Sequence, residues 1–387
     1  MKNKSNVMAI IFIFAMMVLV ATIENVRGVF IPAFKREFSI NDASIGLMIT
    51  ASSLGYILST FIGGGLCERL GQKKVFMLGF IFLIASLGLL SVTYVFPLLL
   101  IAMFIMNVGL ALTGIATNTL VPILFMSFQA VLMNVTHFCY GLGSTIAQRT
   151  SGILISNGIS WRTVYLAEAV IAMVFLILLM FIKMPETHKN KHNKVANNLE
   201  IFRNKLFYFY AAGLGFYVFA EIATATWFVN FMNKVYNYNE SRSSFYLALF
   251  FGIFTVGRLL GGFVVEKTGY LNTVIVSLII ALVLFSLGIF MGQQGMIIIS
   301  ISGLFFAIGF PTIVLSVRKV FKENPDYTTG AVITFASTIN MIMNFFMGIL
   351  NDKVGAHLAF YIIPISLMLS IVNVYIIYRN TKECFSI

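Results

Sequence analysis

Six ionisable residues lie inside long apolar runs of this sequence, where charged side chains are rare. They are Glu24, Arg27, Arg149, Glu168, Glu221 and Arg258. A charged side chain in hydrocarbon costs roughly 2.5–3.5 kcal/mol on insertion scales, so each one is by default a candidate for binding an ion, a proton or a polar solute. The chemistry of this chain is therefore expected at these side chains and at the polar groups beside them.

Glu24, Arg27 and Arg149 are predicted to lie toward the same, outer half of a membrane. The estimate uses a rise of about 1.5 Å per helical residue, counted from the predicted cytoplasmic ends of the runs. Glu24 and Arg27 are three residues apart, so they share a helix face and partly neutralise each other. We expect the two arginines to exchange Glu24, Glu168 or a substrate oxygen as partners. A static cluster of structural ion pairs is the alternative. Glu168 lies near the beginning of its run, close to the outer membrane interface.

Glu221 is predicted to lie near the middle of its apolar run. Tyr217, Thr224 and Phe228 recur on the same helix face as this acid. Such a face presents an acid, two hydroxyl groups and an aromatic ring on which a sugar can stack. Removal from water disfavours a charged carboxylate, which suits Glu221 for reversible protonation. The pattern predicts a substrate or proton site here.

Two further groups of polar residues have a helical spacing. Asn134, His137 and Tyr140 recur at intervals of three residues, and His137 could donate to a hydroxyl group or titrate near neutral pH. A structural histidine bonded to a neighbouring helix is the alternative. Asn340 and Asn344 share a helix face, where they could bind sugar hydroxyls or form hydrogen bonds between helices.

These residues are carried by a chain dominated by apolar segments. Of 387 residues, 59% are hydrophobic and 10% are charged, against roughly 45–50% and 25% in soluble domains, which excludes a water-soluble enzyme. Runs of about 20 apolar residues suit membrane-spanning helices. The sequence predicts an all-α membrane protein with twelve such helices, at about 7–33, 43–66, 75–95, 98–121, 130–155, 162–182, 206–232, 243–265, 271–292, 296–316, 329–350 and 358–378.

Basic residues are distributed unevenly between the loops. If both ends of the chain are cytoplasmic, few basic residues fall on the outer side, namely Lys35, Arg36, Arg162, Lys234, Arg242 and Lys353. Lysine and arginine concentrate on the cytoplasmic side of membrane proteins, so we expect a multi-pass protein of the cell membrane with both termini inside. The same topology explains the net charge of +12 without a nucleic-acid partner.

The chain is predicted to consist of two related halves. A polar stretch at 183–205 reads as a cytoplasmic linker between six-helix halves at 1–182 and 206–387. Gly64-Gly65-Leu66-Cys67-Glu68-Arg69-Leu70-Gly71 is matched by Gly262-Phe263-Val264-Val265-Glu266-Lys267-Thr268-Gly269, 198 residues further on. Two copies at equivalent positions indicate a duplicated, pseudo-symmetric bundle.

The first copy continues through Gln72 to Lys73 and Lys74. It resembles the signature loop between helices 2 and 3 of the major facilitator superfamily, and the resemblance covers essentially the whole chain. We assign the two copies and Arg258, which lies one turn before the second, to gating. The residues concerned are Gly64, Glu68, Arg69, Gly71, Lys73, Lys74, Arg258, Gly262, Glu266, Lys267 and Gly269.

Within that superfamily the chain is most similar to the branch of proton symporters for fucose, galactose and glucose. Tyr217-Val218-Phe219-Ala220-Glu221, followed by Trp227, resembles a pattern of that branch on helix 7, and Gly309-Phe310-Pro311-Thr312-Ile313 resembles its segment on helix 10. Asn118 and Asn134 also fall where the branch places asparagines. The resemblance implies sugar uptake coupled to protons.

Two departures from that branch fall on its acidic positions. Gly114 stands where many members have an acid four residues before the asparagine on helix 4. Gly28 stands where the fucose permease has an aspartate four residues before the proline on helix 1. The coupling chemistry of the branch therefore cannot be transferred to this chain residue by residue.

The sequence predicts a secondary transporter that moves a small polar solute, a sugar, by proton symport with alternating access. No nucleotide-binding motif or catalytic constellation is found, so we expect no enzyme activity, cofactor or bound metal. The expected partners are the solute, a coupling proton and membrane lipid, and the protein is expected to be a monomer. The alternatives are transport of an organic anion or sugar acid, proton-coupled drug export, and a transport-inactive sensor on the same fold.

Overall fold

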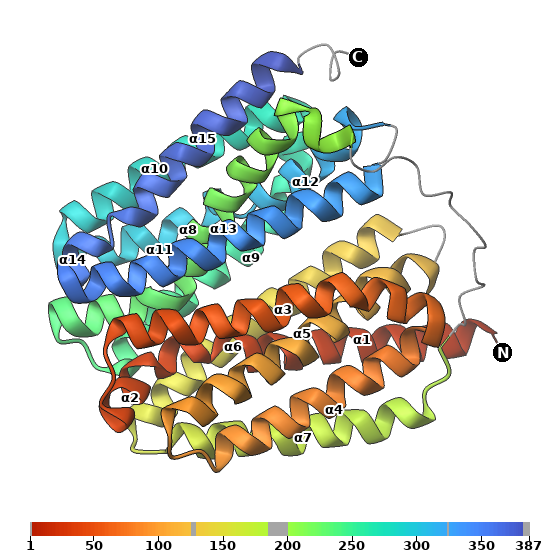
Figure 1. Ribbon diagram of the computed structural model, residues 1–387, viewed down its shortest axis with the longest axis horizontal. Coiled ribbons are helices and arrows are strands. Elements are labelled where there is room, and N and C mark those ends of the chain that lie inside the picture. Colours follow the sequence, from red (N-terminus) through yellow and green to blue (C-terminus); the bar gives the residue numbers. More distant parts are fainter. Residues whose placement is uncertain (1, 125–128, 185–199, 323–324, 382–387) are drawn as a thin grey trace. The chain divides into compact units, whose positions relative to one another are not determined.

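The computed structural model describes the protein except for residues 1, 125–128, 185–199, 323–324 and 382–387. It describes the backbone alone at residues 2–6, 64, 68, 121–124, 129–134, 200 and 325–327. In the part of the chain so described, all regular secondary structure is helical and no strand is present (Figure 1).

The chain forms two compact units. The first comprises Met1–Lys191 with Tyr238–Ala248, and the second comprises His192–Asn237 with Leu249–Ile387. The segment Tyr238–Ala248 includes the start of helix α9 (Glu240–Thr268), so this helix contributes residues to both units. The division of the chain at 183–205 stays a prediction, and most of that linker lies outside the described residues.

The first unit is built from seven described helices in addition to the start of α9. They are α1 (Lys2–Asn25), α2 (Arg27–Phe38), α3 (Asp42–Leu70), α4 (Gln72–Ser91), α5 (Phe96–Leu124), α6 (Gln129–Ser156) and α7 (Trp161–Phe181). α5 packs against α3 and α4, α1 packs against α6, and α4 packs against α7.

The second unit repeats this pattern of helix pairing. Its other described helices are η1 (Glu200–Arg203), α8 (Lys205–Tyr236), α10 (Tyr270–Phe290), η2 (Gly292–Gly295), α11 (Met296–Phe306), α12 (Gly309–Val320), α13 (Pro325–Lys353), α14 (Ala356–Ala359) and α15 (Ile362–Asn380). α8 packs against α13 as α1 does against α6, and α10 packs against α15 as α4 does against α7. The internal repeat in the sequence therefore corresponds to a repeat in helix packing.

Each unit contains an interrupted span in which a proline follows the interruption. α1 ends at Asn25 and α2 begins at Arg27, with Pro32 inside α2. α11 ends at Phe306, and Pro311 lies in the first turn of the next helix. Proline lacks an N–H and its ring clashes with the carbonyl four residues earlier, which disfavours a continuous helix. Irregular backbone at membrane depth is tolerated where protein buries it or where it lines a cavity, so both interruptions are candidate sites.

The repeated glycine motif forms the same turn in both units. Gly71 and Gly269 have φ values of +84° and +88°, a region that glycine occupies readily. Each N–H donates to a carbonyl four residues earlier, Cys67 O or Val265 O, at 3.0 Å. The next helix then begins at once. The last glycine of each copy is thus required by the turn itself.

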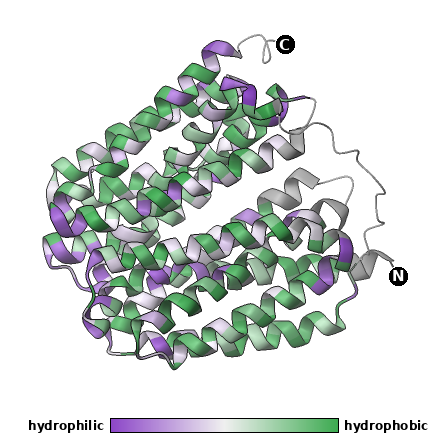
Figure 2. Ribbon diagram, viewed as in Figure 1, coloured by the Kyte–Doolittle hydropathy of each residue, from purple (hydrophilic) through white to green (hydrophobic). Residues whose placement is uncertain are grey.

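Eleven helical stretches of the described residues are long and apolar enough to cross a membrane. α6 is also long enough, since its 28 residues span about 42 Å, but Thr136, Gln148 and Arg149 make it more polar. Apolar residues cover most of the helices, and hydrophilic residues gather near helix ends (Figure 2). The predicted all-helical membrane fold is confirmed, and α6 supplies the twelfth long helix.

Candidate functional site

The first unit contains an acid–tyrosine pair at the end of α1. Tyr140 on α6 donates its hydroxyl hydrogen to Glu24 Oε2, with an O–O distance of 2.6 Å. Asn25 Nδ2 donates to the same tyrosine oxygen at 3.1 Å and to the Ala21 carbonyl at 3.0 Å. The tyrosine therefore uses its single hydrogen on the carboxylate and accepts a hydrogen bond from the amide. Sequence reasoning missed Asn25, although an amide beside an acid in an apolar run was the available signal.

Arg27 and Glu168 are two more charged residues predicted for this cluster, and no ion pair joins them in the described residues. Glu24, Tyr140 and Tyr165 act electrostatically on the half-buried Arg27 guanidinium. Glu168 on α7 is 6% exposed, and its Oε2 has no hydrogen-bond partner in the described part of the chain. The exchange of Arg27 between two acids stays a prediction.

Arg149 makes a different set of contacts from those expected. Its Nη1 donates to the Ser241 carbonyl at 2.7 Å and to Ser241 Oγ at 3.2 Å. Its guanidinium also lies 5.7 Å from the centre of the Phe245 ring. Arg149 is nine residues after Tyr140 on α6, and nine residues correspond to two and a half turns, so the two side chains leave opposite faces of the helix. The role of Arg149 in partner exchange stays a prediction.

The second unit contains another acid–tyrosine pair, this time within one helix. Tyr217 and Glu221 are four residues apart on α8, and the tyrosine oxygen lies 2.7 Å from Glu221 Oε2. The same oxygen lies 2.7 Å from the Phe306 carbonyl at the end of α11. Arg258 Nη2 lies 3.8 Å from Glu221 Oε1, and its guanidinium is 4.5 Å from the Phe254 ring centre. Arg258, which the sequence analysis grouped with the gating motif, is thus next to the acid.

The interruption between α11 and α12 is held by side chains of other helices. The Phe306 carbonyl accepts from Tyr217, and the Phe305 carbonyl accepts from Ser277 Oγ on α10 at 2.8 Å. Gly309 makes the approach of α8 possible, because a Cβ there would lie 2.3 Å from a ring carbon of Tyr217. A glycine and a proline two residues apart, Gly309 and Pro311, were the sequence signal for this interruption.

A second polar chain in this unit links α8 and α13. Trp227 Nε1 donates to Asn344 Oδ1 at 3.1 Å, and Asn344 Nδ2 donates to Asn340 Oδ1 at 2.7 Å. Asn344 is fully buried and Asn340 is half-buried. Thr224 is also buried, and its hydroxyl donates to the Ala220 carbonyl of its own helix. The hydrogen-bonding groups of Asn344 and Thr224 are therefore used within the protein, whereas the amide hydrogens of Asn340 are available to another acceptor.

The remaining predicted substrate-site residues are less informative. The side chains of Asn118 on α5 and His137 on α6 are exposed. The side chain of Asn134 lies outside the described residues, as does that of Glu68 in the gating motif. Gly64 of that motif is described by its backbone alone.

Lys73 is the residue of the gating motif with the most specific contact. Its Nζ donates to the Met180 carbonyl at 2.9 Å and to the Ile182 carbonyl at 2.8 Å, at the C-terminal end of α7. A cation at this end of a helix satisfies free carbonyls and interacts favourably with the helix dipole. Six other residues assigned to gating are exposed: Arg69, Lys74, Gly262, Glu266, Lys267 and Gly269.

The chain resembles known membrane transporters over nearly its full length. A glucose/galactose transporter of Brucella abortus is 24% identical over 356 residues, which cover 86% of this chain and 85% of the relative. The E. coli fucose:proton symporter aligns with a TM-score of 0.68 at 18% identity, covering 96% of this chain and 99% of that one. A D-xylose-proton symporter aligns with a TM-score of 0.79 at 14% identity, covering 96% and 97%. At these identities the two solved structures show a shared fold.

The family is shown by the sequence itself. Residues 12–338 match the Major Facilitator Superfamily, a stretch that includes both acid–tyrosine pairs and both copies of the glycine motif. The family and these relatives are transporters. This chain, a multi-pass membrane protein, belongs to the major facilitator superfamily.

Proposed function

We propose that this transporter imports a neutral sugar together with a proton, by alternating access, across a cell membrane in which both termini face the cytoplasm. The names of the relatives support a sugar as the solute, since they include a glucose/galactose transporter and symporters for fucose and D-xylose. The distribution of basic loop residues supports the orientation. The second acid–tyrosine pair, Tyr217 and Glu221, supports a proton as the coupling ion.

The observation that carries the proposal is that Tyr217 has one hydroxyl hydrogen and two acceptors. Glu221 Oε2 and the Phe306 carbonyl oxygen both lie 2.7 Å from the tyrosine oxygen. A charged carboxylate only accepts hydrogen bonds, so it competes with the carbonyl for that hydrogen. A protonated Glu221 instead donates to the tyrosine oxygen, and Tyr217 then donates to the carbonyl. Both short contacts are fully satisfied only in the protonated state.

Arg258 gives the deprotonated state a partner of its own. Its Nη2 is 3.8 Å from Glu221 Oε1, a long ion pair that a small movement would tighten around a charged carboxylate. Proton release thus strengthens the contact with α9 and takes the tyrosine hydrogen away from the interruption between α11 and α12. Proton binding reverses both changes. Protonation of the Glu221 carboxyl group would in this way change the hydrogen bonding at the interruption between α11 and α12.

Sugar recognition is assigned to polar groups with hydrogen-bonding capacity to spare. Asn340 accepts from Asn344 through Oδ1, which leaves its amide N–H groups for a sugar hydroxyl. The exposed side chain of Asn118 is a further candidate. A neutral sugar needs such paired donors and acceptors, and it does not require a free guanidinium.

The test uses purified protein in proteoliposomes with an imposed inward proton gradient. Uptake is measured for labelled glucose, galactose, fucose and xylose, together with a sugar acid, a dicarboxylate and a cationic drug. We expect uphill accumulation of at least one neutral sugar, which collapses when a protonophore is added. Accumulation of the sugar acid or dicarboxylate alone would overturn the neutral-sugar assignment, and uptake that is insensitive to the protonophore would overturn proton coupling.

The residue assignment is tested in the same vesicles. Glu221→Gln keeps a donor toward Tyr217 but cannot release a proton, so we expect loss of uphill accumulation while exchange of labelled for unlabelled sugar persists. Glu37→Gln is the matched control, because Glu37 is an acid with partners of its own, an ion pair with Arg162 and a hydrogen bond from Trp161. Full concentrative uptake by Glu221→Gln would reject the role of this acid.

A further inference from the structure

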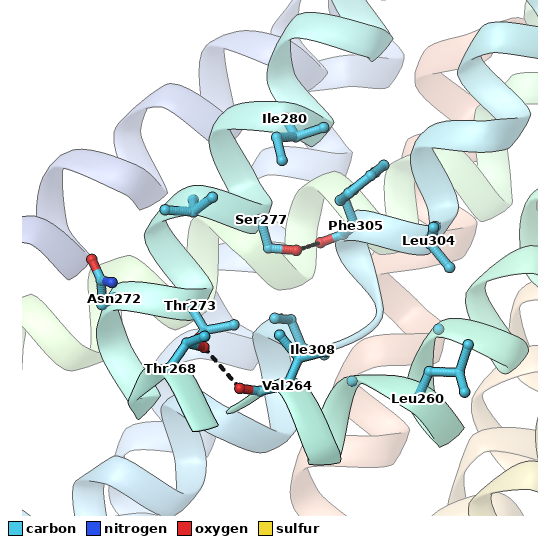
Figure 3. A pocket seen from close by; sticks show the side chains of 13 residues that line it. Leu260, Val264, Thr268, Asn272, Thr273, Ser277, Ile280, Leu304, Phe305 and Ile308 are labelled. Atoms are coloured by element: carbon cyan, nitrogen blue, oxygen red, sulfur yellow. Dashed lines mark hydrogen bonds between the residues drawn. The ribbon is translucent and has the colours of Figure 1, made fainter. Parts of the chain in front are cut away.

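The second unit contains a pocket that none of the predicted substrate-site residues lines. It has a volume of about 460 Å³ and lies between α9, α10 and the interruption of α11 and α12 (Figure 3). This volume is within the range of about 300–1,000 Å³ that is typical of small-molecule sites. Its walls are mainly apolar side chains, among them Leu260, Val264, Val276 and Phe305.

The chemistry of the walls indicates an apolar occupant. Leu260, Val264 and Val276 line the pocket and are 57%, 49% and 49% exposed. They stand on helices that are long and apolar enough to cross a membrane, so such exposed aliphatic side chains belong to a surface in contact with acyl chains. Neighbouring exposed residues on the same helices, such as Phe263 and Ile279, continue that surface. A sugar would find too few hydrogen-bonding partners there, whereas a hydrocarbon chain would bury apolar area on both sides.

One end of the pocket is polar and has basic residues beside it. Thr268 and Asn272 line that end, on either side of the turn between α9 and α10 (Figure 3). Lys267 precedes Thr268 and is exposed, and Lys319 Nζ lies 3.8 Å from the ring centre of Tyr270, the first residue of α10. Glu266 is the one acid within this turn of the described chain. Two cations beside a hydrocarbon pocket complement the head group of an anionic phospholipid.

The far wall of the pocket is the interruption that the proton site also uses. Phe305 and Ile308 face the pocket, and the Phe305 carbonyl is held by Ser277. The neighbouring Phe306 carbonyl accepts a hydrogen bond from Tyr217, the partner of Glu221. A chain that fills the pocket would therefore support one conformation of the interruption, and an empty pocket would leave it room to move.

From this arrangement we propose that the pocket binds an acyl chain of an anionic phospholipid of the surrounding bilayer, and that its occupancy controls transport through the interruption between α11 and α12. The binding part of this inference is independent of the proposed sugar and proton, and only the transport part rests on them.

Binding is tested directly by native mass spectrometry of the full-length protein released from mixed vesicles. The vesicles contain phosphatidylcholine with added phosphatidylglycerol. We expect phosphatidylglycerol to be retained by the wild-type protein and several-fold less by Val264→Trp, whose larger side chain fills the pocket from its exposed rim. Val256→Trp is the matched control, since Val256 is a valine of α9 with the same exposure of 49% that does not line the pocket. Equal retention by the two variants would overturn the proposed site.

The head-group assignment and the link to transport have separate readouts. Lys319→Gln should remove the preference for phosphatidylglycerol over phosphatidylcholine while lipid is still retained, and an unchanged preference would contradict the anionic assignment. In proteoliposomes, added phosphatidylglycerol should change the rate of labelled-sugar exchange by the wild type and Val256→Trp but not by Val264→Trp. If all three respond equally although Val264→Trp has lost its lipid, the control of transport is overturned and the binding site stands.

Discussion

The two units use the same pair of residue types, an acid and a tyrosine, but give the tyrosine hydroxyl group different partners. In the first unit, Tyr140 donates to Glu24 and accepts from Asn25, so the carboxylate is satisfied as an anion. In the second, Tyr217 faces two acceptors with one hydrogen, Glu221 Oε2 and the Phe306 carbonyl, and Arg258 Nη2 lies 3.8 Å from Glu221 Oε1. The other partner of the hydroxyl group is a donor, Asn25, in the first unit and an acceptor, the Phe306 carbonyl, in the second.

Both pairs lie beside an interrupted span, but only one of them holds the interruption. Glu24 is one residue before the end of α1, and its tyrosine partner comes from another helix. Tyr217 binds the Phe306 carbonyl, the last carbonyl of α11, and contacts Gly309 at the start of α12. Discontinuous helices are common at the substrate and ion sites of secondary transporters. Under the proposed function, we therefore expect a change in protonation to reach the backbone more directly in the second unit than in the first.

The largest expected effect comes from removing the charge in the first unit. Glu24→Gln replaces a charged acceptor of Tyr140 and removes a negative charge that acts on Arg27, so we expect a loss of roughly 1.5–3 kcal/mol, the range for hydrogen bonds to charged groups. Glu221→Gln mimics the neutral acid and should cost less than about 1 kcal/mol. Thermal unfolding in detergent micelles ranks the two variants. A lower midpoint for Glu221→Gln than for Glu24→Gln would reverse the comparison.

Tyr217→Phe should have the next largest effect, on coupling. It removes the hydroxyl group that joins Glu221 to the Phe306 carbonyl, and an unsatisfied buried carbonyl costs about 1–3 kcal/mol. We expect uphill uptake to fail while the protein still binds sugar. Tyr140→Phe is the matched variant in the first unit and should retain the dependence of uptake on the proton gradient. If both variants lose coupling equally, the hydroxyl group of Tyr217 has no special role.

Gly309→Ala tests the close approach of α8 to the interruption. A Cβ would lie 2.3 Å from the Tyr217 ring, so the ring or the backbone must move, at a cost of about 1–3 kcal/mol for overpacking. Sugar exchange should slow. Gly262→Ala meets nothing within 4 Å and should leave thermal stability unchanged or slightly raised. Equal behaviour of the two alanine variants would show that the approach of Tyr217 does not matter.

The smallest effect concerns the glycine motif, in which the two units also differ. Lys73 binds two carbonyls at the end of α7, whereas Leu271 occupies the equivalent position 198 residues later. Lys73→Ala should therefore lower stability by about 0.5–1 kcal/mol, the usual value of a helix-end contact. Lys74→Ala, at an exposed neighbour, is the control. A loss of transport at unchanged stability would instead support the predicted gating role.

Local spacing predicted the second pair better than the first. Tyr217 and Glu221 are four residues apart, so a helix places them on one face whatever the tertiary structure. Glu24 and Tyr140 are 116 residues apart, and both were candidates, but only the packing of α1 on α6 makes them partners. The all-helical fold was predictable because the length and composition of membrane spans are fixed by the bilayer.

Tertiary contacts were the part that the sequence left open. Arg258 was grouped with the glycine motif by its position in the chain, and its place beside Glu221 depends on how α9 packs. Arg149 was expected near the acids, and its contact with Ser241 depends on which residues the start of α9 brings to α6. Pro311 is evident in the sequence. The partners of the carbonyls at the interruption, Tyr217 and Ser277, come from other helices and could not be predicted from it.

Infrared difference spectroscopy of the reconstituted protein during a pH change tests the proposal that Glu221 alternates between protonated and charged states while Glu24 remains charged. We expect a carboxylic-acid C=O stretching band that appears on acidification, is lost in Glu221→Gln and shifts in Tyr217→Phe. The same band should persist in Glu24→Gln and in Glu168→Gln. A band that survives Glu221→Gln, or one that is lost in Glu24→Gln, would contradict the account.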